Sequence, residues 1–191
     1  MSTITKRLSV EQYEAMIENG ILPESNRFEL IEGKLVEKMT KGGKHSAGSE
    51  RAWRAIHALL PGGWHVRIEK PVRIPSRRSE PEPDVSVARG GVDDYEDRNP
   101  DAADVALIVE VSEPSIAKDR RLARVYAGGN IPTYWLLDLA GRQLEVYSDP
   151  VAGVYPAPRI LAETESADVV LDGQVVGRIA VADLLPPESR P

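Results

Sequence analysis

The chain of 191 residues contains no cysteine. A disulfide framework and a thiolate metal site are therefore excluded, and a reducing, cytoplasmic setting is expected. Aromatic residues make up only 5% of the sequence, which argues against a glycosidase because sugar sites need rings that stack on the substrate. No apolar run approaches the roughly 18–20 residues of a membrane helix. The N-terminal segment MSTITKRLSVEQ lacks the apolar core of a signal peptide, so we expect no membrane association.

The rest of the composition is typical of a soluble globular protein. Hydrophobic residues make up 41% and charged residues 28% of the chain. Its length suits one domain, and we see neither an internal repeat nor a linker, so residues 1–191 are predicted to form a single domain. The net charge of −6 does not favour nucleic-acid binding. A local cluster of basic residues can nevertheless bind phosphate on an acidic protein.

Capping and turn signals divide the chain into alternating helices and strands. We expect helices at 9–20, 45–60 and 116–127. Strands are expected within 27–39 and 64–75, and at 83–88, 104–112, 133–139, 143–149, 159–163, 168–171 and 174–179. Residues 89–103 hold glycines, a proline and many acids, which is typical of an exposed loop. The pattern predicts an α/β fold with a mixed central sheet flanked by helices.

Glu110 conflicts with the strand that contains it. The stretch DVALIVEVSEPS, residues 104–115, is almost continuously apolar and rich in β-branched residues, as in a strand buried on both faces. An unpaired carboxylate there costs several kcal/mol or stays protonated. The conflict predicts either a function for Glu110 or an ion pair at the end of the strand.

Asp84 offers Glu110 a partner. It begins the next strand back in EPEPDVSVA, so neighbouring strands would bring the two carboxylates to one edge of the core. Carboxylates placed together repel, so one takes a proton or a divalent cation joins them. Oxygen ligands favour Mg²⁺ or Mn²⁺ over zinc. Repulsion alone also predicts that an amide at either position stabilises the metal-free protein. The alternative for Asp84 is a turn residue that starts a strand after proline.

Several segments in the same order resemble a known family. Pro83-Asp84 and the EVS of residues 110–112 resemble the core of the PD-(D/E)XK nuclease superfamily. The resemblance narrows to the Uma-type family of restriction-endonuclease-like proteins through FELIEGKLV (28–36), His45, EVSEPSIAKD (110–119) and YAGGNIPTYWLLD (126–138). It implies a restriction-endonuclease-like fold with a core at about 8–148 and a C-terminal β-hairpin extension.

The resemblance also implies roles for individual residues. Asp84 and Glu110 would be the metal ligands and catalytic acids, Glu29 would complete the site, and His45 would face the site and its DNA. The superfamily's third motif residue falls at Ser112, which cannot supply a cation. Relatives place a lysine on the following helix, where DRRLARVY (119–126) has Leu122 or Ala123 instead. The neighbouring cations Lys118 and Arg121 are the predicted substitutes, with Arg120 and Arg124 close by.

A basic cluster precedes the Asp84 strand. Its members are Arg67, Lys70, Arg73, Arg77 and Arg78. The cluster predicts contact with a DNA backbone, although a solvated edge strand protected by charge would have the same composition.

These residues lead to two functional hypotheses. The first is a Mg²⁺- or Mn²⁺-dependent endonuclease that hydrolyses DNA, and the second is an inactive nuclease-like module that binds nucleic acid or protein. A homodimer is expected because the superfamily cleaves two strands, and because Tyr134, Trp135 and Tyr147 need cover.

Overall fold

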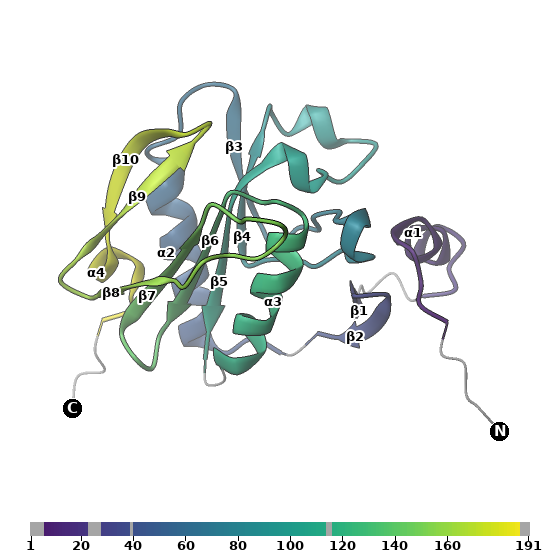
Figure 1. Cartoon of the computed structure of the whole chain (residues 1–191), viewed down its shortest axis with the longest axis horizontal. Helices are drawn as coiled ribbons and strands as arrows, with labels where there is room; N and C mark the ends of the chain where they lie inside the picture. Colours follow the sequence, from purple (N-terminus) through teal and green to yellow (C-terminus); the bar gives the residue numbers. More distant parts are fainter. Residues whose placement is uncertain (1–5, 23–27, 39, 114–115, 188–191) are drawn as a thin grey trace.

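The computed structural model describes residues 6–22, 28–38, 40–113 and 116–187. Its centre is a six-stranded sheet in the order β3-β4-β5-β6-β7-β8 (Figure 1). The strands are β3 (Trp64–Ile68), β4 (Val85–Arg89), β5 (Val105–Ser112), β6 (Thr133–Asp138), β7 (Gln143–Ser148) and β8 (Arg159–Ala162). Strands β5 and β6 pair in parallel, and the other neighbours in this sheet are antiparallel. The prediction of a mixed central sheet is confirmed.

The parallel pair requires a crossover, and helix α3 (Ile116–Gly128) supplies it. Strand β5 is buried along its whole length, as its apolar run predicts. Side chains of α3, including Tyr126, pack with Ile108 and Leu136 on one face of the sheet. This packing sets α3 directly over the strand that carries Glu110.

The other face of the sheet is covered by helix α2 (Gly43–His57), the short helix α4 (Val181–Leu184) and the hairpin of β9 (Ser166–Leu171) and β10 (Gln174–Ala180). Ala52 and Ile56 of α2 pack with Val109 and Trp135 of the sheet in one core cluster. Figure 1 shows α2 and α3 on opposite sides of the strands. The predicted C-terminal β-hairpin extension is present as β9 and β10, and its apolar side chains pack in the same core cluster as α2.

The N-terminal elements form a third, smaller cluster. Helix α1 (Val10–Glu18) begins with the predicted capping box between Ser9 and Gln12. Strands β1 (Phe28–Ile31) and β2 (Lys34–Glu37) form a hairpin whose turn residues have φ of 48° at Glu32 and 76° at Gly33. A Cβ at Gly33 would lie 2.7 Å from that of Arg7, so glycine is required there for space as well as for φ.

Several element bounds differ from the sequence prediction by a few residues. Helix α2 begins two residues before position 45 and ends at His57 instead of 60. Of the one or two strands expected within 64–75, one is present at Trp64–Ile68, and a 3₁₀ turn follows at Pro75–Arg77, because Pro71 and Pro75 cannot donate to a ladder. The loop at 89–103 contains further 3₁₀ turns at Asp93–Tyr95 and Ala102–Asp104. None of the helices within the described ranges is long and apolar enough to cross a membrane.

Candidate metal and nuclease site

Asp84 and Glu110 lie side by side at one end of the central sheet. The antiparallel register pairs Val85 with Val109, so the next positions outward are Asp84 and Glu110. The backbone N–H of Val111 donates to Asp84 Oδ2 at 2.7 Å, and the N–H of Asp84 points to Glu110 Oε2 at 3.4 Å. Each carboxylate is thus held by the backbone of the other strand. The predicted juxtaposition of these two side chains is present in the structure.

Glu110 has a partner on the crossover helix. Its residue exposure is 8%, and Tyr126 of α3 donates its hydroxyl to Glu110 Oε1 at 2.6 Å. Burial, followed by the nearby charge of Asp84, raises the pKa of Glu110 well above its ordinary value. Burial and the charge of Asp84 favour the protonated carboxyl, whereas the hydrogen bond from Tyr126 acts in the opposite direction and supplies the buried oxygen with a partner.

Asp84 has the opposite environment although it is equally buried. Lys41 Nζ lies 2.6 Å from Asp84 Oδ1, and His45 Nε2 lies 3.1 Å from Asp84 Oδ2. Burial pushes the pKa of Asp84 upward, but the hydrogen bond from His45 and the charge of Lys41 outweigh it, so the pKa lies below its ordinary value. Asp84 is therefore the ionised member of the pair.

Lys41, like Tyr126, is a partner of the carboxylate pair that sequence reasoning missed. It lies in the segment before α2, and its ammonium also bonds Glu69 Oε1 at 3.0 Å. Position 41 is 43 residues from Asp84, and no motif spacing connects the two. The loop that leads into α2 brings them together, and only the tertiary structure specifies its path.

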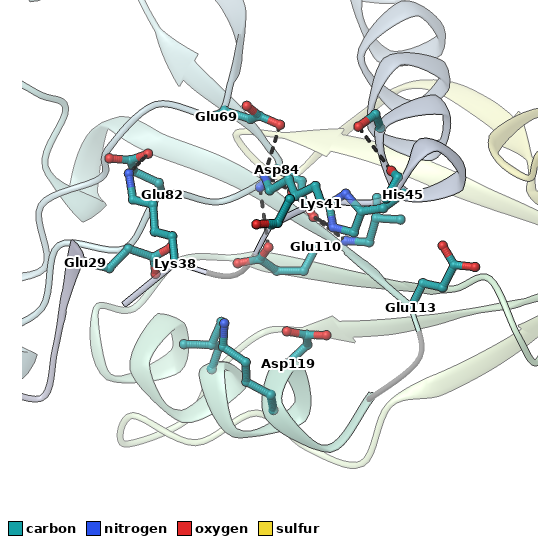
Figure 2. A pocket seen from close by; sticks show the side chains of 16 residues that line it. Glu29, Lys38, Lys41, His45, Glu69, Glu82, Asp84, Glu110, Glu113 and Asp119 are labelled. Atoms are coloured by element: carbon teal, nitrogen blue, oxygen red, sulfur yellow. Dashed lines mark hydrogen bonds and ion pairs between the residues drawn. The ribbon is translucent and has the colours of Figure 1, made fainter. Parts of the chain in front are cut away.

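A cavity of about 740 Å³ opens over the carboxylate pair (Figure 2). Its charged lining is mainly acidic: Glu29, Glu69, Glu82, Asp84, Glu110, Glu113 and Asp119, against Lys38, Lys41 and Lys118. Such an excess of carboxylates in a concave site attracts cations. Lys38 forms an ion pair with Glu82 and neutralises one of the acids.

Glu29 reaches this cavity from the N-terminal hairpin. It lies on β1, and burial raises its pKa to about 6, while the charge of Lys118 acts in the opposite direction. Glu29 is thus part of the same cavity as Asp84 and Glu110, on the wall drawn at the left of Figure 2.

The α3 wall of the cavity holds the predicted substitutes for the missing lysine. Lys118 is exposed and lines the cavity, whereas Arg121 is exposed and is not among the described lining residues. Leu122 lines the cavity, and Ala123 packs in the core. Of the two positions at which relatives would carry the lysine, 122 is the one that faces the site.

The donor chemistry fits a hard divalent cation. Asp84 and Glu110 supply oxygen atoms, and the Lys41 ammonium shows that this spot accepts positive charge. Among the described residues, no group of three or more His, Asp or Glu side chains is arranged to hold a metal ion. Asp84 and Glu110 place two carboxylates side by side at this cavity.

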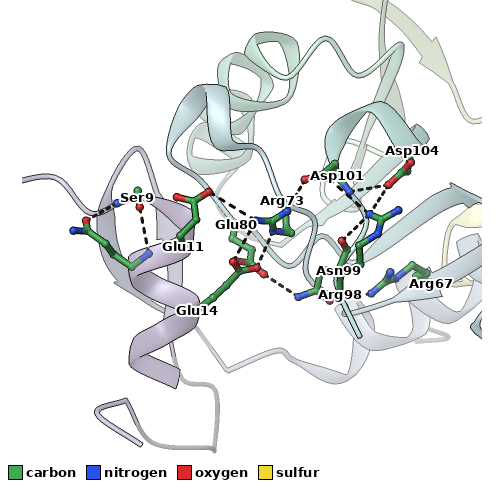
Figure 3. A network of polar contacts seen from close by, with 11 residues as sticks. Ser9, Glu11, Glu14, Arg67, Arg73, Glu80, Arg98, Asn99, Asp101 and Asp104 are labelled. Carbon is green, nitrogen blue, oxygen red and sulfur yellow. Dashed lines mark hydrogen bonds and ion pairs between the residues drawn. The ribbon is translucent and has the colours of Figure 1, made fainter. Parts of the chain in front are cut away.

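The basic residues that were predicted to contact DNA differ in their partners and in their exposure. Arg73 bonds Glu14 and Asp101, and Figure 3 shows it between α1 and the loop before β5. Arg77 pairs with Glu32. The remaining members are Arg67, half-buried near Tyr95 and Asn99, and Lys70 and Arg78, which are exposed.

The sheet, the crossover helix and the paired carboxylates define a restriction-endonuclease-like protein. The chain belongs to the Uma2 family, described as "Putative restriction endonuclease", whose model matches residues 10–181. The match extends past residue 148, where the sequence predicted the core to end, and includes β8 to β10. A comparison with curated proteins gave no match.

A solved structure has the same fold. It is the crystal structure of a "putative nuclease belonging to DUF820" from Anabaena variabilis ATCC 29413, with a TM-score of 0.69 and 19% sequence identity. The alignment covers 93% of this chain and 97% of that one, so the fold is shared over nearly the full length of both.

Proposed function

We propose that this chain is a Mg²⁺- or Mn²⁺-dependent endonuclease that hydrolyses phosphodiester bonds of DNA. The observation that carries the proposal is the pair of buried carboxylates, Asp84 and Glu110, held by each other's strand beneath a cavity with an acidic lining. Two adjacent carboxylates at the end of an apolar strand repel each other, and a divalent cation bound between them would remove that repulsion. Family membership supports the same class of reaction.

Asp84 and Glu110 would hold the metal ion. When bound, that ion would polarise the phosphate and lower the pKa of a water molecule. His45 orients Asp84 through Oδ2, and Tyr126 orients Glu110 through Oε1. Glu29 provides a further carboxylate at the cavity wall, and its pKa of about 6 suits proton exchange with water near neutral pH.

The hydrolysis itself balances without a further reactant. A water oxygen forms a bond to phosphorus, and one P–O ester bond breaks with its electron pair remaining on the leaving oxygen. That oxygen takes up a proton, and the phosphate product keeps the hydroxyl of the water. Lysines at the cavity offset the negative charge that develops on the phosphate oxygens, with Lys118 on the exposed face of α3. Arg121 lies three residues further along the same helix and is a candidate for DNA backbone contact.

We further propose that Lys70, Arg78 and the accessible part of Arg67 contact DNA phosphates. Arg73 and Arg77 would assist by fixing the position of this segment through their ion pairs with Glu14 and Glu32. Cleavage of two strands would require a homodimer.

A non-catalytic module that binds nucleic acid or protein is the second candidate. Leu122 favours it, because this position faces the cavity and cannot supply a cation. The two candidates differ in one measurable property, since only the nuclease consumes DNA in a cation-dependent reaction.

The test is incubation of the protein with plasmid, linear and single-stranded DNA in Mg²⁺, Mn²⁺ or EDTA. We expect cleavage with either cation and none in EDTA. Glu110→Gln and Asp84→Asn should each lower the rate by at least about 10²-fold, whereas Glu50→Gln, an exposed change on α2, should not. Binding of DNA without cleavage under every condition would favour the module instead.

A further inference from the structure

The family resemblance implies a lysine on the crossover helix where this chain has Leu122 or Ala123, and the same cavity holds a lysine from another element. Lys41 approaches from the loop before α2, on the opposite side of the cavity from α3 (Figure 2). Its ammonium is within bonding distance of the carboxylate that the proposed function assigns to the metal. We propose that Lys41 is the catalytic cation of this enzyme and takes the place of the missing α3 lysine. This inference rests on the proposed function.

The position of Lys41 is suited to contact with substrate. Its side chain is 32% exposed while that of Asp84 is 3% exposed, so the ammonium lies between a buried anion and the open cavity. The second partner, Glu69, is 49% exposed at the cavity rim. A flexible lysine held between a buried and an exposed carboxylate can move to a phosphate oxygen without leaving the site.

The contact with Asp84 also implies competition. In the free protein the ammonium occupies one oxygen of the carboxylate that a divalent cation would need. Metal binding would displace the ammonium from Asp84 Oδ1 and leave its N–H donors available for the phosphate. Lys41 would then neutralise charge on the phosphate oxygens and would not need to lose its proton.

Lys118 is the rival cation from the same cavity. It is an exposed residue on α3, one helical turn before Leu122, and its charge acts on Glu29 and Asp119. Lys41 differs because it is bonded to Asp84, one member of the carboxylate pair. Geometry therefore favours Lys41 for the reacting phosphate and Lys118 for a neighbouring one.

The experiment compares Lys41→Met with Lys44→Met in the full chain. Lys44 is an exposed residue three positions away and lies outside the described lining of the cavity. Lys44→Met therefore removes the same charge as Lys41→Met without changing the cavity. We measure Mn²⁺ binding by calorimetry and cleavage of plasmid DNA in Mn²⁺. Lys41→Met should bind Mn²⁺ about tenfold more tightly, because the competing ammonium is gone. It should cleave about 10²–10³-fold more slowly, because an electrostatic stabiliser of the transition state is gone.

Tighter Mn²⁺ binding together with slower cleavage in Lys41→Met would distinguish a catalytic role of Lys41 from a structural one. If Lys41→Met loses Mn²⁺ binding together with cleavage, Lys41 only positions Asp84 and the inference is wrong. If it cleaves as fast as Lys44→Met, the inference is also wrong while the proposed function stands. If the unmodified protein cleaves no DNA in Mn²⁺, the proposed function fails and this inference fails with it. Adding Leu122→Lys to the Lys41→Met variant should recover part of the lost rate. If this double variant folds and binds Mn²⁺ but cleaves no faster, a lysine at position 122 cannot replace Lys41, and the inference is contradicted.

Discussion

At the scale of single residues, two carboxylates of the same charge have opposite roles in the free protein. Asp84 is ionised because Lys41 and His45 contact it from the loop before α2 and from α2 itself. Glu110 is held by the hydroxyl of Tyr126, and burial followed by the charge of Asp84 raises its pKa. Repulsion alone would raise the pKa of either carboxyl, but their different contacts lower the pKa of Asp84 and leave that of Glu110 raised.

This asymmetry changes the expectation for the two amide variants. Glu110→Gln keeps an oxygen for the Tyr126 hydroxyl and removes a group that resists ionisation, so the free energy of unfolding in EDTA at pH 7 should not fall. Asp84→Asn leaves Lys41 and His45 facing a neutral amide and should lower it by about 2–3 kcal/mol.

Urea denaturation of the two variants, with Glu50→Gln as the exposed control, measures the difference. Equal losses in both would show that Glu110 is an ordinary structural acid. Added Mn²⁺ should stabilise the unmodified protein more than either amide variant, since a cation stabilises by binding only the folded state.

At the scale of elements, a partly buried polar network attaches α1 to the loops that connect β3, β4 and β5 (Figure 3). Arg73 bonds Glu14 of α1 and Asp101 of the loop before β5. Beneath it, Glu80 is 3% exposed and accepts a hydrogen bond from Asn99 Nδ2 at 2.9 Å. Burial, followed by the charge of Glu14, raises the pKa of Glu80 to about 7.

Glu80 should therefore make the stability of the protein depend on pH. A folded-state pKa above the unfolded value means that the stabilisation is fully present below about pH 4.5 and is lost as pH rises through about 7. Glu80→Gln has no carboxyl group to ionise, so its stability does not fall in this way, and its amide oxygen can still accept the hydrogen bond from Asn99. Relative to the unmodified protein, the variant should gain about 2–3 kcal/mol between pH 4.5 and pH 8.

Urea denaturation at several pH values tests this, with Glu50→Gln as the matched control. Glu29 shifts in the same direction but is present in every variant, so the difference between the curves isolates Glu80. A constant difference between Glu80→Gln and the unmodified protein across this range would contradict the argument.

At the scale of the whole molecule, the aromatic residues that were expected to need a second subunit are covered by the chain itself. Tyr134 and Trp135 are 0% exposed and Tyr147 is 9% exposed. Tyr134 and Tyr147 pack with Tyr155 on the α3 face, and Trp135 packs on the α2 face. The case for a dimer now rests on two-strand cleavage and on the edge strand β8, which presents Ile160 at 49% exposure.

Light scattering at micromolar concentration tests the dimer. A homodimer should have twice the chain mass of 21.0 kDa. A single species of 21.0 kDa, with and without DNA, would contradict the prediction and would leave nicking of one strand as the expected reaction.

Local patterns in the sequence predict most of the elements. The capping box at Ser9, the turn at Glu32 and Gly33 and the apolar run of β5 each depend on residues within a few positions of one another. The conflict at Glu110 also marked the site, because a carboxylate inside a buried strand requires a partner wherever the strand is placed. Asp84 could be paired with it on the assumption that the two strands are neighbours in one sheet and bring both carboxylates to the same edge.

The contacts between distant segments were decided only by the tertiary structure. Lys41 and Tyr126 come from different elements, and no periodicity in the chain relates their positions, whereas His45 was expected at the site from the family resemblance. The sequence does not distinguish the basic residues of 67–78 from one another. In the structure, Arg73 and Arg77 form ion pairs with Glu14 and Glu32, whereas Lys70 and Arg78 are exposed. The sequence by itself determined which residues must be buried and which carboxylates conflict with burial, because those properties are local. The fold decided which charge meets which carboxylate, because that depends on where loops of no regular pattern bring the chain back.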